Sequence, residues 1–122
     1  MFMSKKPRKS RKEAREMPMH RKAKTIAGHL NEKLRKEIGK RALPLRKGDV
    51  VKIIRGAFKG KEGKINRVDR KNKKIFIEKI MKKKSDGTEF EVAIDASKII
   101  VTEIDKSDRK RLKQIKKKSD KK

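Results

Sequence analysis

A run of glycines with cations between them is the part of this sequence best suited to chemistry. It lies in residues 48–69, GDVVKIIRGAFKGKEGKINRVD. The glycines are Gly56, Gly60 and Gly63. The cations beside them are Arg55, Lys59, Lys61 and Lys64. Glycine permits positive φ and the close approach of another chain, and cations beside exposed N–H groups contact phosphate. We expect this loop both to shape a corner between strands and to bind phosphate.

The loop does not match a nucleotide-binding pattern. The Walker pattern requires four residues between its glycines and Ser or Thr after its lysine. Here three residues separate Gly56 from Gly60, and Glu62 follows Lys61. We therefore do not expect a nucleoside triphosphate at this loop.

The net charge indicates a polyanionic partner. The chain of 122 residues has 42 Lys and Arg against 16 Asp and Glu, a formal charge of +26. This density makes a compact state repel itself, and a polyanion relieves the repulsion. The net charge is +13 in residues 1–47, +5 in 48–105 and +8 in 106–122. Most of the excess therefore lies outside the one segment that can form a core, although charge alone does not identify the polyanion.

Catalytic and metal-binding constellations are not expected. The chain has no cysteine, which excludes disulfides and thiolate sites. His20 and His29 lie in basic segments that lack partner ligands. Glu89 and Glu91 share a strand face next to lysines, and we expect them to keep that face away from nucleic acid. We expect no enzyme activity, no metal site and no cofactor.

The apolar residues predict five short strands after residue 47. The runs are 50–54, 65–68, 75–81, 88–94 and 98–102. The Asp86-Gly87 pair predicts a tight hairpin turn. Phe90, Val92 and Ile94 alternate with other residues, so we expect one buried face there. Five strands with short turns predict a small closed or half-closed barrel.

The basic segments on either side of the predicted strands indicate a small folded body with basic arms. Pro7 and Pro18 interrupt the N-terminal arm, which we expect to be extended. The domains expected are a basic N-terminal extension over 1–42, a β domain over 43–105 and a basic C-terminal helix or tail over 106–122.

Two short helices are predicted in these flanks. The first lies near residues 31–39, where Asn31 can cap it and Gly39 can end it. It can pack on the core or lie in a groove of nucleic acid. The second begins at Ser107, with Asp108 in its first turn.

The aromatic residues limit how bases can be recognised. Proteins that read single-stranded bases use aromatic platforms, and this chain has four Phe without Tyr or Trp. Phe58 is the candidate platform, at the glycine loop. We expect Phe76 and Phe90 in the core and Phe2 at the terminus. Most of the affinity should come from phosphate contacts and shape.

The sequence resembles a known family at these same residues. Residues 48–69 are similar to the KOW motif of ribosomal proteins and transcription elongation factors. RKGDVVKIIRGAFKGKEGK, IFIEKI, KKSDGTEFEVAI and ASKIIVTEI resemble consecutive segments of the large-subunit ribosomal protein twenty-four family in its archaeal and eukaryotic form. HRKAKTIAGHLNEKLRKEIGKRALPLRKGD resembles the N-terminal extension of that form.

The resemblance implies a mainly β fold, a small SH3-like barrel that carries the KOW motif. It implies binding to large-subunit rRNA early in assembly, near the exit of the nascent-chain tunnel. The implied partners are rRNA, neighbouring ribosomal proteins and nascent-chain or targeting factors, and the implied location is the cytoplasmic ribosome. One departure is Asp95-Ala96, where the family usually has His-Pro. For that reason the 95–97 turn is not among the expected RNA contacts.

The expected RNA contacts are basic side chains of the arm, the glycine loop and the Lys82–84 run, together with Phe58 and Gly60. They are Lys5, Lys6, Arg8, Lys9, Arg11, Lys12, Arg21, Lys22, Lys24, Arg41, Arg46, Lys47, Arg55, Phe58, Lys59, Gly60, Lys61, Lys64, Lys82, Lys83 and Lys84.

Two other classes of protein stay open. A KOW module of a transcription elongation factor would follow a globular domain, whereas a basic arm precedes the motif here. A nonspecific DNA-compacting protein would oligomerise, and no apolar stripe for that is visible. No apolar run is long enough to span a bilayer. We therefore expect no membrane insertion and no homo-oligomer.

Overall fold

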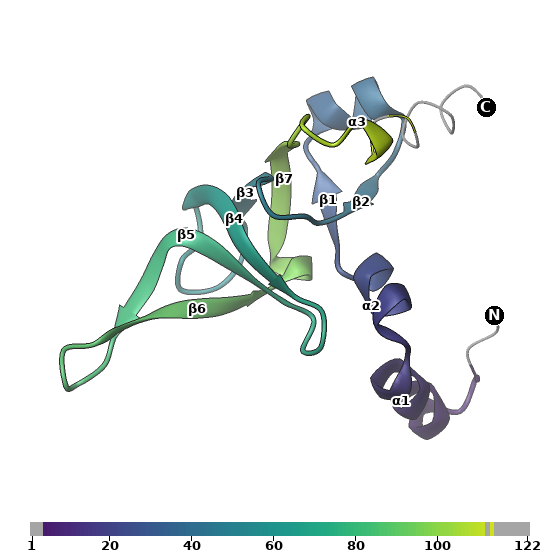
Figure 1. Ribbon diagram of the computed structural model, residues 1–122, viewed down its shortest axis with the longest axis horizontal. Helices are drawn as coiled ribbons and strands as arrows, with labels where there is room; N and C mark the ends of the chain where they lie inside the picture. Colours follow the sequence, from purple (N-terminus) through teal and green to yellow (C-terminus); the bar gives the residue numbers. More distant parts are fainter. Residues whose placement is uncertain (1–3, 112, 114–122) are drawn as a thin grey trace.

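The computed structural model describes residues 4–111 and 113, and a mixed β-sheet of seven strands forms the body of the fold (Figure 1). Helices and strands follow each other along the chain as α1 (Pro7–Glu16), α2 (Met19–Thr25), β1 (Ala27–Leu30), α3 (Glu32–Ile38), β2 (Ala42–Pro44), β3 (Val50–Ile53), β4 (Glu62–Asp69), β5 (Lys74–Lys83), β6 (Glu89–Asp95), the 3-10 helix η1 (Ala96–Lys98) and β7 (Ile99–Glu103). The mainly β class expected from the sequence is confirmed.

The sheet is open, with the strand order β2-β1-β7-β3-β4-β5-β6. Its neighbouring strands are antiparallel, except that β1 pairs with β7 in parallel through His29 opposite Ile100 and Leu30 opposite Val101. Of the closed or half-closed barrel expected from the sequence, the closed form is therefore wrong, and the half-closed form stays a prediction. The edge of β7 is occupied by β1, which comes from the N-terminal extension, and this pairing continues the sheet into β2. The SH3-like form that the resemblance implies stays a prediction.

The five strands predicted after residue 47 are all present, as β3 to β7. The Asp86-Gly87 turn joins β5 to β6, with Gly87 at φ 89° and its N–H donating to the Lys84 carbonyl at 3.0 Å. The Asp86 carboxylate accepts from the N–H and the hydroxyl of Thr88. The sequence signal for this hairpin is thus confirmed residue by residue.

The N-terminal arm is helical where the sequence predicted extended chain. Pro7 stands in the first turn of α1, where a helix needs no N–H donor. Pro18 precedes α2, and its carbonyl accepts from the N–H groups of Arg21 and Lys22. Both prolines therefore start helices instead of interrupting them. The helix α1 buries no residue, and it extends away from the sheet in Figure 1.

The helix predicted near 31–39 is confirmed as α3. The Asn31 side chain accepts from the Glu32 N–H at 2.7 Å, and Gly39 ends the helix at φ 69° with its N–H donating to the Arg35 carbonyl. Ile38 is buried and Leu34 packs against the core. Of the two roles considered for this helix, packing on the core is the one that the structure shows.

The core is made mainly of isoleucines from both sides of the first expected domain boundary. Its members are Ile26, Leu30, Ile38, Leu43, Leu45, Val51, Ile53, Ile65, Ile75, Ile77, Ile80, Ile94, Ile99 and Val101. Three of these, together with strand β1, belong to the expected extension 1–42. The division into extension, β domain and tail stays a prediction, but the sheet and core cross its first boundary.

Two of the phenylalanines expected in the core lie elsewhere. Phe90 is 42% exposed, and Phe76 is half-buried with the Arg67 guanidinium 4.2 Å from its ring centroid. Phe76 alternates with the buried Ile75 and Ile77, so its side chain lies on the opposite face of β5. Phe90 is displaced by a bulge in β5. Its register against β6 shifts between Phe76 and Met81, and Lys79 there adopts φ 64°. Bulges bend a strand, so the end of the hairpin that carries Phe90 projects past the core (Figure 1).

The C-terminal segment begins a helix, as predicted, but Asp108 caps it. One Asp108 carboxylate oxygen accepts from the N–H groups of Lys110 and Arg111 at 3.0 and 3.1 Å. Residues 109–111 are helical. The expectation that the helix starts at Ser107 is off by one or two residues, and residues 114–122 of the predicted tail lie outside the described residues. None of the helices in the described part of the chain has the length and apolarity needed to span a bilayer.

Candidate nucleic-acid interface

The glycine loop between β3 and β4 is built on two residues with positive φ. Gly56 has φ 102° and Gly60 has φ 88°, values that side chains rarely permit. The N–H of Gly60 donates to the Ile53 carbonyl at 2.8 Å, and the N–H of Ile53 donates to the Lys61 carbonyl at 2.9 Å. These bonds close the base of the loop.

Gly63 is required for a different reason. A Cβ on this residue would lie 2.7 Å from Cγ2 of Ile77 and 3.0 Å from the carbonyl oxygen of Glu78. The absence of a side chain thus lets β4 approach β5 closely. Both uses of glycine expected from the sequence, positive φ and close approach, are present in this loop at different residues.

The four cations of the loop are exposed to solvent. They are Arg55, Lys59, Lys61 and Lys64. Phe58 lies among them but is half-buried against the core, with the Lys61 ammonium 5.2 Å from its ring centroid. The loop therefore presents charge at its surface and holds its aromatic ring on a packed base.

Two acidic residues, Glu62 after the glycine loop and Glu91 on β6, are bound by neighbouring side chains. Glu62 pairs with Lys52 at 3.0 Å. Glu91 accepts from the Asn66 side-chain amide at 2.7 Å and lies 3.8 Å from the Arg67 guanidinium. Glu91 therefore orients cationic and polar groups of β4, beyond the repulsive role expected for it from the sequence.

The other expected contacts divide between the arm, the turn before β3 and the β5–β6 hairpin. All are exposed except Lys22, which is buried, and the half-buried Phe58. Lys82, Lys83 and Lys84 lie at the end of the hairpin, and the Lys84 ammonium is 5.7 Å from the Phe90 ring centroid. The structure does not gather all these residues in one patch, because the arm and the hairpin extend in different directions (Figure 1).

A groove of about 1150 Å³ brings several of them together. It lies between α2, the turn before β3, β4 and the segment 105–111. It contains three of the expected contacts, Lys24, Arg46 and Lys47, and adds Arg67 and Arg70 from the end of β4. These two arginines were not predicted to bind RNA. Their spacing of three in the strand–turn sequence RVDR was the signal that could have identified them.

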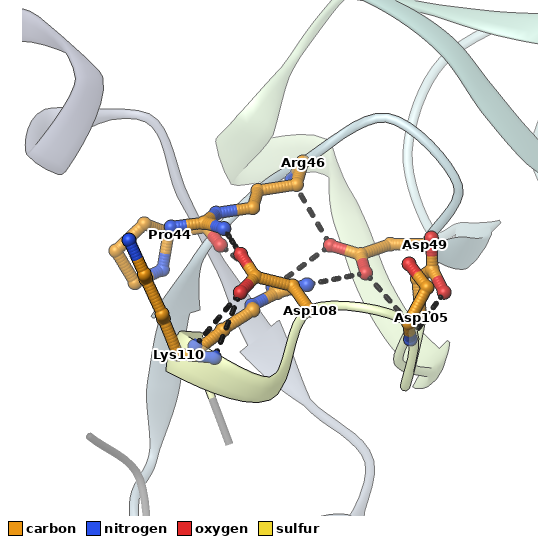
Figure 2. A network of polar contacts seen from close by, with 8 residues as sticks. Pro44, Arg46, Asp49, Asp105, Asp108 and Lys110 are labelled. Carbon is orange, nitrogen blue, oxygen red and sulfur yellow. Dashed lines mark hydrogen bonds and ion pairs between the residues drawn. The ribbon is translucent and has the colours of Figure 1, made fainter. Parts of the chain in front are cut away.

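A buried ion pair supports the floor of this groove. Asp49 is 0% exposed and Arg111 is 7% exposed. The guanidinium donates to both carboxylate oxygens, at 2.7 and 2.9 Å, and to the Pro44 carbonyl at 2.9 Å. The N–H groups of Arg46 and Asp105 also donate to the Asp49 carboxylate, at 3.0 and 3.1 Å (Figure 2).

This pair fixes the C-terminal segment on the sheet, and an ion pair between Arg46 and Asp108 lies next to it (Figure 2). The carboxyl of Asp105 hydrogen-bonds to the Ser107 N–H, which lowers the pKa of Asp105. The sequence pattern gave no sign of the pair, because its members lie 62 positions apart. An acidic residue before a β-branched run, or an arginine in a lysine-rich tail, is common on protein surfaces and does not by itself indicate a buried ion pair.

No group of three or more His, Cys, Asp or Glu side chains that could hold a metal is found in residues 4–111 and 113. The expected contacts are cations, a loop backbone and one aromatic ring, which are groups that bind nucleic acid, and Glu91, Asp105 and Asp108 also line the groove. His20 lines the groove beside Lys24, and His29 is exposed in β1.

Comparison with known proteins identifies the relatives of this chain. The family described as the eukaryotic ribosomal proteins L26 and their archaeal counterparts of the L24 type matches residues 4–118. The large ribosomal subunit protein uL24 of Sulfolobus acidocaldarius is 42% identical over 117 residues, which are 96% of this chain and 87% of that protein. The proteins of the same name from Methanosphaera stadtmanae and Korarchaeum cryptofilum are 39% identical over 109 residues and 41% over 111, each covering 89% of this chain and 93% and 85% of the relative.

These matches confirm the resemblance found in the sequence. They give no support to a transcription elongation factor or to a DNA-compacting protein. Because the family model and its relatives cover nearly the whole chain, the chain belongs to the family of large-subunit ribosomal proteins that comprises eukaryotic L26 and its archaeal counterparts, components of the ribosome in the cytoplasm.

Proposed function

We propose that this chain is a structural protein of the large subunit that binds rRNA through phosphate and shape contacts. The observation that carries the proposal is the glycine loop, where four exposed cations surround a backbone held in shape by Gly56 and Gly60. A cationic loop of fixed shape matches the phosphate backbone of folded RNA, because phosphate contacts set the position of a protein without reading sequence.

The arm adds a second cationic surface. Residues 5–16 contain seven Lys or Arg against two Glu, and α1 buries none of its side chains. Within the described residues, this exposed basic helix buries no side chain against the rest of the chain. Neutralising RNA phosphates therefore accounts for both its charge and its exposure.

The family supplies the finer parts of the proposal. RNA of the large subunit and neighbouring ribosomal proteins are the partners that membership implies. We extend this, from the resemblance, to joining early in subunit assembly at a place near the tunnel exit, where nascent-chain or targeting factors can contact the exposed side. The protein acts there as a single copy, without a cofactor and without catalysis.

Binding to large-subunit rRNA at several salt concentrations tests the proposal. On a duplex, each neutralised phosphate contributes about 0.9 to the negative slope of log affinity against log salt. Replacing Lys59, Lys61 and Lys64 by alanine should weaken binding and reduce this slope by about 2 to 3. In the matched control, Lys33, Arg35 and Lys36 are replaced by alanine. This variant loses the same amount of positive charge, but from the exposed face of α3.

A control variant that loses as much affinity as the loop variant would show that net charge, and not the loop, directs binding. An affinity that does not depend on salt would contradict the phosphate mechanism. Sedimentation of a cell lysate then tests the location. Co-migration with large subunits is expected, and co-migration with polymerase or chromatin would contradict it.

A further inference from the structure

A small pocket lies where the glycine loop meets β6. Its volume is about 190 Å³, and its lining includes the apolar side chains of Phe58, Val92 and Ile94. Three cations also line it: Arg55, Lys82 and Lys98, the last of which pairs with Asp95 at 3.4 Å. No acidic side chain lines the pocket in the described part of the chain. An apolar cavity with cations around it fits a flat, weakly polar group that carries negative charge at its edge.

Phe58 provides a firm wall for such a group. Its ring is half-buried and packs against the core. Two backbone hydrogen bonds also hold the loop next to the ring. The Ile54 N–H donates to the Lys98 carbonyl at 2.9 Å, and the Lys61 N–H donates to the Phe58 carbonyl at 3.1 Å. Every nucleobase has a π-face that stacks on an aromatic side chain, and a fixed ring loses little entropy when it does so.

The loop offers backbone donors next to the cations. The N–H groups of Gly56, Ala57 and Phe58 make no hydrogen bond to the backbone of another described residue. They lie beside the exposed guanidinium of Arg55. Successive N–H groups next to a cation form an anion-binding surface, so a phosphate can be held at the edge of the pocket.

The hairpin extends the same surface on the other side. Lys82 lines the pocket and lies opposite Phe90 in the β5–β6 pairing, so both side chains are on one face of the hairpin. Phe90 is 42% exposed, with the Lys84 ammonium over its ring. A second aromatic ring with its own cation therefore continues from the pocket along the hairpin.

We propose that this pocket takes one unpaired nucleotide of rRNA, with its base against Phe58 and Val92 and its phosphates near Arg55 and Lys82. The inference rests on the proposed binding to rRNA and deepens it, because it adds base stacking to an interface otherwise driven by charge. A paired base is excluded from such a contact, since its faces are already stacked in the duplex.

The test uses the full-length chain and an RNA hairpin with a single unpaired 2-aminopurine. A hairpin of the same stem, with every base paired, is the control RNA. Binding should change the fluorescence of the unpaired base, and the chain should prefer the first hairpin by at least about fivefold, the lower end of what stacking of one base contributes.

Two variants locate the contact. Phe58→Leu removes the ring and keeps an apolar side chain, and Ala57→Leu fills the pocket from an exposed position without removing a core contact. Each should abolish the preference and leave the slope of affinity against salt unchanged, because neither removes a charge. Phe76→Leu is the matched control, since Phe76 is also half-buried but does not line the pocket, and it should keep the preference.

The outcomes separate this inference from the function on which it rests. Equal binding of both hairpins by the wild-type chain would overturn the pocket proposal and leave salt-dependent binding intact. The same holds if Ala57→Leu, with a normal thermal unfolding curve, keeps the preference. A wild-type chain that binds neither hairpins nor large-subunit rRNA would instead overturn the proposed function itself.

Discussion

Asp49 and Arg111 form a buried, two-point ion pair that joins the start of β3 to the C-terminal segment. The two distances are 2.7 and 2.9 Å, and the side chains are 0% and 7% exposed. Both side chains have further hydrogen-bond partners within the protein. The guanidinium donates to the Pro44 carbonyl, and two backbone N–H groups donate to the Asp49 carboxylate. The basic C-terminal segment is thus fixed to the folded body as far as Arg111.

Replacing Arg111 by alanine should destabilise the fold strongly. The variant leaves the Asp49 carboxylate buried without its cation, and breaking a buried pair in this way costs about 3–5 kcal/mol. Urea denaturation of the two proteins measures the difference in unfolding free energy. The control is Arg109→Ala, an exposed position on the same segment, where the change should be within about 0.5 kcal/mol.

Equal stability of the two alanine variants would show that the pair contributes nothing. A double variant with Asp49→Leu and Arg111→Met separates the charge from the packing. Replacing both partners of a buried pair by apolar groups is often neutral or stabilising. We therefore expect the double variant to be more stable than Arg111→Ala alone.

The sequence predicted those elements whose signals are local. Asn31 and Gly39 define α3 at its two ends, and the alternation of Ile99 and Val101 marks the buried face of β7. Each of these depends on neighbours within a few positions. Asp49 could be seen at the start of a strand, but its partner could not, because nothing in the spacing of 62 residues distinguishes Arg111 from other basic residues of the tail.

Three further features differ from the expectations or were not anticipated, each for a physical reason. Pro7 and Pro18 fit the start of a helix as well as a break in one. The parallel pairing of β1 with β7 unites strands from opposite ends of the chain, which no local pattern shows. Phe90 continues an alternation that is buried at Ile94, but the bulge in β5 bends the hairpin away from the core.

Replacing Gly63 or Gly56 by alanine should destabilise the protein for two different reasons. At Gly63 the new Cβ would overlap neighbouring atoms, and at Gly56 the backbone would be strained. The new Cβ at Gly63 would meet Ile77 and the Glu78 carbonyl at 2.7 and 3.0 Å, and overpacking of this kind costs about 1–3 kcal/mol. Gly56 has open space but φ 102°, where alanine is strained by at least about 1 kcal/mol. Thermal and urea unfolding of the two variants measure both costs. An unchanged stability at Gly63 would mean that β4 can move away from β5.

The Asp95 ion pairs should make stability depend on acid pH. The hydrogen bond from the Lys74 ammonium, followed by the effect of Lys98, lowers the pKa of Asp95 below its ordinary value. A carboxyl with a lowered folded pKa stabilises the protein above its unfolded pKa, near 3.9, and this contribution is lost as the pH falls through the folded pKa. Asp95→Asn should therefore be less stable than the wild type at pH 7, by less than about 1 kcal/mol because the pair is partly exposed.

The difference between Asp95→Asn and the wild type should disappear below the folded pKa, where the wild-type carboxyl is protonated as well. Urea midpoints across the acid range measure this convergence. Glu37→Gln, which removes one negative charge from an exposed position on α3, is the control for net charge. A difference that persists at the lowest pH would mean that the side-chain amide disturbs packing and that ionisation of Asp95 is not the cause.

Removing residues 1–16 should weaken RNA binding and leave the fold intact. The helix α1 has no buried residue, whereas Lys22 of α2 and the adjoining Ile26 are buried. A cut after Glu16 therefore removes charge without opening the core, and a cut after Ile26 would remove a core side chain.

The shortened chain should keep its unfolding free energy within about 0.5 kcal/mol and lose part of the salt dependence of rRNA binding, by up to about 0.9 in slope for each phosphate released. A shortened chain with full affinity would mean that the arm does not touch RNA, and one that unfolds would mean that α1 is needed by the sheet.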